Sequence, residues 1–169
     1  MDRVSPGPAA TWRIDGARIN DPDAAALVEE VQLEYVARYG SRDETPIPPG
    51  YFEHPQGAFF VGYSDGIPIA TGAWHLRRDV EALGSTAAAE IKRMYVAPAG
   101  RGQGLARAML AHLETTARAA GAEVMILETG SEQPEALSLY ASAGYLPIPG
   151  FGFYRDSPLN RCLARRLTG

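Results

Sequence analysis

The 169-residue sequence has one cysteine, Cys162, no long apolar run and no cluster of basic residues. A single cysteine excludes an intramolecular disulfide and a metal site built from several cysteines, and it is typical of a reducing compartment. No apolar stretch approaches the roughly 20 residues of a membrane-spanning helix. The first ten residues, MDRVSPGPAA, contain no apolar core of the kind found in secretory signals. We therefore expect a cytoplasmic protein without membrane contacts.

The overall charge is weakly acidic, because 16 Lys and Arg stand against 20 Asp and Glu, a net charge of −4. Binding to DNA or RNA phosphates needs a basic patch, so nucleic acid is not an expected partner. The length and the 46% content of hydrophobic residues fit one globular domain. We expect this domain to span 11–169, preceded by a flexible segment at 1–10 that is rich in proline, glycine and alanine.

Hydrophobic periodicity and turn residues predict a mixed α/β domain. Helices are expected at about 22–39, 104–120 and 133–143, because each has an apolar stripe and proline or glycine at an end. Strands are expected at 11–19, on both sides of a turn at 64–66 within 57–76, at 89–97, 123–129 and 159–167, with a short one near 144–148. The segment 41–57 carries four prolines and predicts a long loop, a plausible lid over a site.

A glycine-rich loop lies between the strand expected at 89–97 and the helix expected at 104–120. Gly100, Gly102 and Gly104 allow a bound group to approach the backbone closely. Backbone N–H groups at a helix N-terminus also carry a partial positive charge. The loop therefore predicts an anion site, best suited to phosphate.

Two common phosphate-binding motifs do not fit this loop. A P-loop is excluded because no Lys-Ser/Thr pair follows the glycines. The dinucleotide-binding pattern G-x-G-x-x-G fails because Arg107 stands at its third glycine position. A third pattern, R/Q-x-x-G-x-G/A, is met by Arg101, Gly104 and Ala106.

The loop belongs to a longer block, EIKRMYVAPAGRGQGLARAML, which is followed downstream by LSLYASAGY. In order and spacing these two blocks resemble the GNAT superfamily of acetyl-CoA-dependent N-acetyltransferases. ILETGSEQPEAL and the FGFY-x-x-SPL stretch resemble its small-molecule-type subgroup. The resemblance implies the α/β fold of that superfamily: a mixed central sheet of about seven strands with flanking helices, splayed between the strands at 89–97 and 123–129.

The resemblance implies acetyl-CoA as the cosubstrate, and no metal. Its pyrophosphate would bind the N–H groups of the glycine-rich loop, and its pantetheine arm would pair with the strand before the loop. The Val96 N–H, or a neighbour, would face the thioester carbonyl. The residues expected to contact acetyl-CoA are Met94, Tyr95, Val96, Arg101, Gly102, Gln103, Gly104, Leu105 and Ala106.

The resemblance also implies two catalytic residues. Glu90 matches the general-base position and Tyr140 the general-acid position. Burial would raise the pKa of a strand carboxyl toward a useful value for a base, whereas an ion pair with Lys92, Arg93 or another cation would make Glu90 structural. His75 is an alternative base, and Tyr140 is alternatively a packed helix residue.

The acceptor is expected to lie against an aromatic wall that includes Tyr35, Tyr39, Trp74 and Phe151. The resemblance favours a small-molecule amine that attacks acetyl-CoA directly in a ternary complex. A protein or peptide amine as the acceptor and a non-catalytic acyl-CoA sensor remain alternatives at this point. A homodimer is compatible with the sequence.

Overall fold

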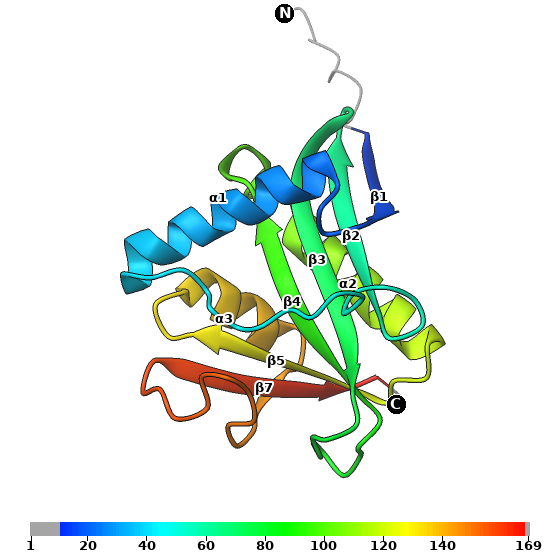
Figure 1. Ribbon diagram of the computed structural model, residues 1–169, viewed down its shortest axis with the longest axis vertical. Coiled ribbons are helices and arrows are strands. Elements are labelled where there is room, and N and C mark those ends of the chain that lie inside the picture. The colour runs from blue at the N-terminus through cyan, green and yellow to red at the C-terminus, as the bar shows by residue number, and fades with distance from the viewer. Residues whose placement is uncertain (1–10, 168–169) are drawn as a thin grey trace, which may run out of the picture.

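The computed structural model describes residues 11–167, so the segment 1–10 lies outside the described residues. These residues form a seven-stranded sheet in the order β1-β2-β3-β4-β5-β7-β6. Helix α1 crosses one face of the sheet, and α2 and α3 lie on the other (Figure 1). The strands are β1 (Trp12–Ala17), β2 (Gly57–Ser64), β3 (Ile67–Arg77), β4 (Ala88–Val96), β5 (Val124–Gly130), β6 (Leu146–Pro147) and β7 (Asn160–Arg166). The helices are α1 (Pro22–Tyr39), α2 (Leu105–Ala119) and α3 (Pro134–Ser142), with a single 3-10 turn, η1 (Pro98–Gly100).

The ends of the elements follow from local chemistry. Helix α1 begins at Pro22, whose fixed φ suits a first helical position. It ends before Gly40, which adopts φ +81° and donates its N–H to the Val36 carbonyl. Asp21 occupies the N-cap position, but its carboxylate accepts the Arg18 N–H at 2.9 Å instead of capping the helix.

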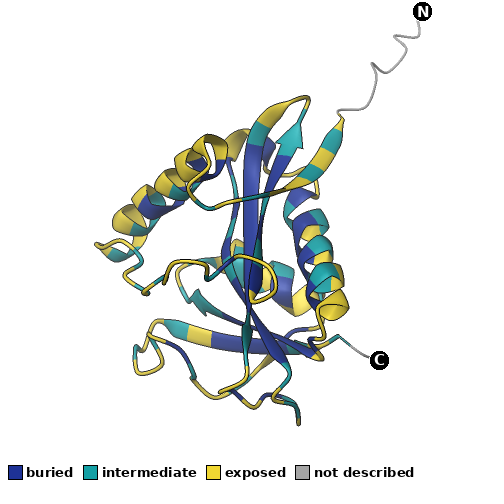
Figure 2. Cartoon of the chain, turned by 45° about the vertical axis from the view of Figure 1, so that its right-hand side comes forward, coloured by how far each residue is buried: buried dark blue, intermediate teal, exposed yellow. Residues whose placement is uncertain are grey.

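The core has two main parts, one on each face of the sheet. The face under α2 buries Met109, Leu113 and Ala117 of that helix against β3, β4 and β5. The face under α1 buries Leu27 and Val31. Figure 2 shows the result: the central strands are buried, and the exposed residues of the helices point outward. The sheet is therefore covered on both sides, as expected for a mixed α/β domain.

The two central parallel strands separate partway along their length. β4 pairs with β5 only as far as Ile91 and Leu127, although β4 continues to Val96 and β5 to Gly130. The expected splay between these strands is thus confirmed.

A β-bulge lies where the strands separate. The register between β3 and β4 shifts between Thr71 and Ala73, and Arg93 adopts a left-handed conformation with φ +53°. The Thr71 hydroxyl donates to the Arg93 carbonyl at 2.7 Å, which holds this conformation in the buried interior. A bulge bends its strand and increases the local twist, so it turns the end of β4 away from β5.

Gly72, opposite the bulge, allows a close contact with α2 that can be tested. A Cβ at this position would lie 2.8 Å from Met109 Cγ and 3.0 Å from Leu113 Cδ1, both in fully buried side chains. We expect Gly72→Ala to lower the free energy of unfolding by about 1–3 kcal/mol through overpacking, measured by urea denaturation. The control is Gly16→Ala on β1, where nothing lies within 4 Å. Equal denaturation midpoints for the two variants would contradict this account.

Candidate active site

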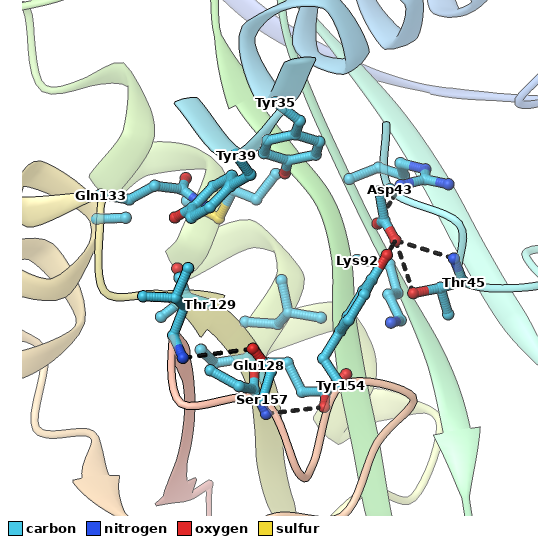
Figure 3. Close-up of a pocket in the computed structure, with 18 of the residues that line it drawn as sticks. Tyr35, Tyr39, Asp43, Thr45, Lys92, Glu128, Thr129, Gln133, Tyr154 and Ser157 are labelled. Atoms are coloured by element: carbon cyan, nitrogen blue, oxygen red, sulfur yellow. Dashed lines mark hydrogen bonds and ion pairs between the residues drawn. The ribbon is translucent and has the colours of Figure 1, made fainter. Parts of the chain in front are cut away.

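A cleft of about 310 Å³ opens where β4 and β5 separate (Figure 3). Its walls come from the end of α1, the segment after α1, the splayed parts of β4 and β5, the start of α3 and the loop before β7. Because α1 and α3 lie on opposite faces of the sheet, the cleft connects the two faces. Two molecules could therefore enter from opposite sides and meet between the strands.

The glycine-rich loop ends at an uncapped helix N-terminus. Gly104 is the N-cap residue of α2, with φ +77°, and no side chain caps the helix. Gly102 has the same φ of +77°, and a Cβ on either glycine would meet open space. The first N–H groups of a helix have no partner within it. The loop and helix thus have the open backbone that an anion site requires.

The side chains of this loop point back to the protein. Arg101 Nη2 lies 2.6 Å from a carboxylate oxygen of Glu34 on α1, and its Nε donates to the Val96 carbonyl at 3.0 Å. Gln103 donates to the Ala99 carbonyl at 3.3 Å. The backbone of the loop therefore remains for a ligand, while these two side chains stabilise the loop.

The register of β3 and β4 determines which way the Val96 backbone points. Ala97 donates its N–H to the Ile69 carbonyl at 2.7 Å, which makes these two residues a hydrogen-bonded pair. Hydrogen-bonded and non-hydrogen-bonded pairs alternate along an antiparallel ladder, so the next pair, Ala70 with Val96, is a non-hydrogen-bonded one. The N–H and C=O of Val96 therefore point away from β3, toward the splay.

The backbone groups of Tyr95 point the opposite way from those of Val96, and Met94 contributes its side chain to the cleft. By the same alternation, Tyr95 forms a hydrogen-bonded pair with Thr71, so its backbone groups face β3. The Tyr95 hydroxyl donates to Glu30 of α1 at 3.3 Å. The Met94 side chain lines the cleft, and its sulfur lies 3.6 Å from the Tyr140 hydroxyl.

Tyr140 is both packed and placed in the cleft. It lies on α3, is 6% exposed, and its ring meets Tyr145 edge to face at 5.5 Å. Burial raises the pKa of Tyr140 well above its ordinary value, so the phenol stays protonated. The residue has the protonation state that a proton donor needs.

Glu90 does not line the cleft and is held by three basic side chains. It is 1% exposed, and its Oε1 lies 3.0 Å from His75 Nε2 and 2.9 Å from Arg77 Nη1. Its Oε2 lies 3.2 Å from Lys92 Nζ. Burial alone would raise the pKa of Glu90, but the hydrogen bond from His75 and the charge of Lys92 outweigh it and lower the pKa. The expected rise in pKa is therefore wrong, and the ion-pair interpretation describes this residue. His75 itself stacks on Tyr51 at 3.8 Å, outside the cleft.

A second carboxylate, Glu128 on β5, does line the cleft. Its Oε1 accepts a hydrogen bond from Asn160 at 3.2 Å, whereas its Oε2 is buried without a partner among the described residues. Burial raises the pKa of Glu128 above its ordinary value. Sequence reasoning missed this residue, although it lies in ILETGSEQPEAL; the available signal was a single charge in an otherwise apolar strand.

Two of the four residues expected on the acceptor side line the cleft. Tyr35 and Tyr39 project from the end of α1 toward the splay (Figure 3). Burial raises the pKa of Tyr35 to about 12. The Tyr39 hydroxyl is buried without a hydrogen-bond partner in the described part of the chain, and it packs directly on Gly130.

The other two, Trp74 and Phe151, lie elsewhere. Trp74 is 3% exposed under α2, where its indole N–H donates to Thr116 at 2.9 Å. Phe151 packs beside Val80 and Ala82 in a separate small cluster. Neither contributes to the cleft wall, so the structure does not bring them together with Tyr35 and Tyr39. Alternation along β3 points Trp74 to the α2 face, and no sequence pattern fixes where the loop at 151 turns.

The segment 41–57 is fixed over the cleft by polar contacts. Asp43 Oδ2 lies 2.7 Å from Arg93 Nη1 at the bulge, and its Oδ1 accepts the Thr45 hydroxyl at 2.7 Å. Tyr154, in the loop before β7, accepts the Glu44 N–H at 2.8 Å. The proline-rich segment and the loop at 151–158 thus meet at one end of the cleft.

Residues 11–167 contain no group of three or more His, Cys, Asp or Glu side chains arranged to hold a metal ion. None of the helices in this part of the chain is both long enough and apolar enough to cross a membrane.

Comparison with known proteins gives consistent matches. Residues 24–145 match the model of the Acetyltransferase (GNAT) family. A protein of Azospirillum brasilense named IAA acetyltransferase is 34% identical over 113 residues, which are 67% of this chain and 70% of that protein. A structure from Klebsiella pneumoniae, assigned as an acyl-CoA N-acyltransferase, has a TM-score of 0.73 at 27% identity and covers 92% of this chain and 97% of that one. A structure from Salmonella typhimurium, assigned as an acetyltransferase and solved with acetyl-CoA, has a TM-score of 0.65 at 21% identity. The match covers 92% of this chain and 94% of that one. The fold expected from the sequence is confirmed.

The ion pair between Asp43 and Arg93 makes the stability of the cleft wall depend on pH. Burial opposes ionisation of Asp43, but hydrogen bonds from Thr45 and the charge of Arg93 lower its pKa. A lowered pKa stabilises the fold above the unfolded value of about 3.9, and this stabilisation is lost as the pH falls through the folded value. Since Arg93 is buried, we expect Asp43→Asn to lower the free energy of unfolding by about 3 kcal/mol at pH 7. The difference from wild type should shrink below about pH 4.

Urea denaturation at several pH values measures this difference. The matched control is Asp15→Asn, because Asp15 pairs with Arg13 at 2.9 Å on the surface, where both side chains are about half exposed. Exposed pairs contribute at most about 1 kcal/mol. A loss in Asp43→Asn no greater than in the control would show that the buried pair is not stabilising.

Proposed function

Since this chain belongs to the GNAT acetyltransferase family, we propose that it transfers the acetyl group of acetyl-CoA to the amine of a small molecule within a ternary complex. The cleft that passes between β4 and β5 is the main support, because it lets donor and acceptor approach each other from opposite faces. Direct transfer needs no nucleophile on the protein. In keeping with this, Cys162 is buried, and burial raises the pKa of its thiol.

The residues on the donor side fit acetyl-CoA, which supplies an activated acyl group as a thioester. The uncapped start of α2 and the open positions at Gly102 and Gly104 suit a pyrophosphate. Met94 lines the splay, and the Val96 N–H, which points away from β3, offers a hydrogen bond to the donor, whereas the Val96 carbonyl already accepts from Arg101. Donor binding would thus depend on backbone groups from Val96 to Ala106 more than on the side chain of Arg101, which is paired with Glu34.

Tyr140 is the proposed proton donor. Its hydroxyl lies in the cleft beside Met94 Sδ, and its raised pKa keeps the proton on Oη until a stronger base forms next to it. A departing thiolate is such a base. We expect Oη to provide the proton that converts it to the free thiol.

The acceptor end of the cleft favours a compact molecule over a peptide. Tyr35, Tyr39 and Tyr154 provide aromatic walls. The hydrogen bond between Tyr154 and Glu44 joins the two loops across this end, which leaves a bounded pocket instead of a long groove. The name of the Azospirillum relative, IAA acetyltransferase, also supports a small-molecule acceptor.

Substitution of Gly104 tests the donor site. At φ +77° a Cβ costs about 1–2 kcal/mol of backbone strain. A change in the backbone that relieves this strain would move the first N–H groups of α2. We expect Gly104→Ala to weaken acetyl-CoA binding about tenfold, measured by isothermal titration calorimetry. The matched control is Gly66→Ala in the β2–β3 turn, with φ +79° and equally open space. If both variants bind as wild type does, α2 does not hold the donor.

Substitution of Tyr140 tests the proton donor. Phenylalanine keeps the packing against Tyr145 and removes only the hydroxyl. We expect Tyr140→Phe to lower kcat by about 100-fold with little change in the acetyl-CoA dissociation constant, measured by thiol release with a panel of primary amines. The control, Tyr63→Phe, removes a hydroxyl that bonds Asp23 far from the cleft. A variant with wild-type kcat would refute the role of Tyr140.

A further inference from the structure

The proposed transfer requires a group that takes a proton from the acceptor amine, and Glu90 is badly placed for it. Its Oε1 lies 2.9 Å from the Arg77 guanidinium and 3.0 Å from the His75 ring, and its Oε2 lies 3.2 Å from the Lys92 ammonium group. It is 1% exposed and does not contribute to the cleft wall. A carboxylate that is buried and triply paired would lose these interactions on taking up a proton.

The Oε2 atoms of Glu90 and Glu128 both lack a hydrogen-bond partner among residues 11–167, but that of Glu90 lies 3.2 Å from Lys92 Nζ. Glu128 forms no such ion pair in this part of the chain. It is on β5 immediately beyond the last residue paired with β4, so it lies at the base of the splay. One carboxylate oxygen is held by Asn160, and the other has no hydrogen-bond partner among residues 11–167. Figure 3 shows Glu128 across the cleft from Tyr35 and Tyr39. It is the one glutamate in the wall of the cleft among the residues that the structure describes.

The carboxylate of Glu128 is also held firmly. The backbone of Gly152 packs against it so closely that a Cβ on Gly152 would lie 2.1 Å from Glu128 Cδ. Asn160 fixes Oε1 at 3.2 Å. A side chain with this orientation is already ordered before a ligand binds, which is a requirement for efficient proton transfer.

We infer that Glu128 is the catalytic residue that accepts the proton of the acceptor amine, and that Glu90 is a positioning residue that acts through Lys92. This inference rests on the proposed function. The amine binds as an ammonium ion and gives one proton to the Glu128 carboxylate. The freed nitrogen lone pair forms the bond to the acyl carbon while the carbon–sulfur bond breaks. The thiolate takes a proton from the Tyr140 hydroxyl and becomes the free thiol. The nitrogen, now bonded to the acyl carbon, loses its second proton, which passes through solvent to Tyr140 and restores the hydroxyl. Glu128 releases the first proton to solvent.

Charged and titratable neighbours set the protonation of Glu128. From β4, Lys92 lowers the pKa of Glu128 and Glu90 raises it. From β7, Cys162 Sγ lies 4.0 Å away, and its own pKa is raised, so it stays a neutral thiol. From the loop before β7, the backbone of Tyr154 lowers the pKa. Burial outweighs these effects, and the pKa of Glu128 is raised overall.

The test is the pH dependence of kcat/KM for thiol release, with benzylamine as the probe amine. At neutral pH benzylamine is protonated to an ammonium ion, and its single aromatic ring suits the pocket beside Tyr35 and Tyr39. In the wild type we expect a rise of kcat/KM with pH that follows the deprotonation of Glu128. Without this base only the neutral amine reacts. Glu128→Gln should therefore lower kcat/KM at pH 7 by about 100-fold and move the rise up to the pKa of benzylamine.

Glu90→Gln is the matched variant, with an opposite expected shift. This substitution removes a negative charge that raises the pKa of Glu128, and it frees Lys92 to lower that pKa further. The rise of kcat/KM with pH should therefore move to lower pH. If Glu90→Gln does not fold, Lys92→Gln serves instead and should move the rise to higher pH. Acetyl-CoA affinity, measured by calorimetry, checks the folding of each variant.

The outcomes separate the inference from the proposed function. A wild-type enzyme that turns over, with a Glu128→Gln variant of unchanged rate and profile, overturns the role of Glu128 and leaves the acetyl transfer intact. If the wild type releases no thiol with benzylamine, the transfer to this amine fails. In that case the pKa of Glu128 is measured by ¹³C NMR titration of protein with labelled glutamate carboxyls. The Glu128 signal is identified as the one that is missing in Glu128→Gln. A pKa above that of an ordinary glutamate that falls when benzylamine is added supports the inference, and an ordinary or insensitive pKa overturns it.

Discussion

The separation of β4 from β5 is the feature on which the rest of this structure depends. In the interior of a sheet, each strand normally satisfies the backbone groups of its neighbour. Here pairing stops after Ile91 and Leu127, and both strands continue without each other. The backbone of Val96 therefore faces an opening in the middle of the sheet instead of another strand. Such an internal edge is costly unless a ligand or solvent satisfies it, and the proposed contact of the donor with the Val96 backbone would satisfy it.

The bulge at Arg93 connects this separation to the acceptor side. A left-handed conformation in a non-glycine residue is unfavourable by about 1–3 kcal/mol and persists only where its surroundings hold it. The Thr71 hydroxyl binds the Arg93 carbonyl, and Asp43 binds its guanidinium. The second contact also fixes the segment after α1 over the cleft. The same residue thus bends β4 and anchors one wall of the cleft.

The fold could be predicted from the sequence because its signals are local. Pro22 and Gly40 mark the two ends of α1, and Asp65 with Gly66 marks the hairpin turn. The direction of individual side chains depends on longer-range contacts. A bulge breaks the alternation of a strand without a sequence signature of its own, since Arg93 is a residue with no special preference for φ above zero. Trp74 lies in the core under α2 and not in the cleft wall, and the sequence could not predict this because an aromatic strand residue suits a core and a ligand wall equally well.

The two carboxylates show why the candidate site was only partly predictable. Glu90 and Glu128 both follow an apolar stretch in a central strand, and burial acts to raise the pKa of each. Their final shifts have opposite signs, because His75, Arg77 and Lys92 surround Glu90, whereas Glu128 accepts hydrogen bonds from Asn160 and from the Cys162 thiol and forms no ion pair in the described part of the chain. The basic side chains around Glu90 come from β3 and β4, and their proximity depends on strand register. Desolvation can be inferred from a sequence, but the charges that oppose it are known only from the fold.

The proposed donor site and the proposed acceptor site rely on different parts of the chain. At the donor end, the proposed contacts are backbone N–H groups presented by Val96 and by the start of α2, which many side-chain changes would leave in place. At the acceptor end, the walls are side chains such as Tyr39 and Tyr154, carried by the end of a helix and by a loop. These positions can change without disturbing the sheet. It follows that a motif in the sequence can identify the donor, whereas the proposed acceptor site around Glu128 can be described only from the fold.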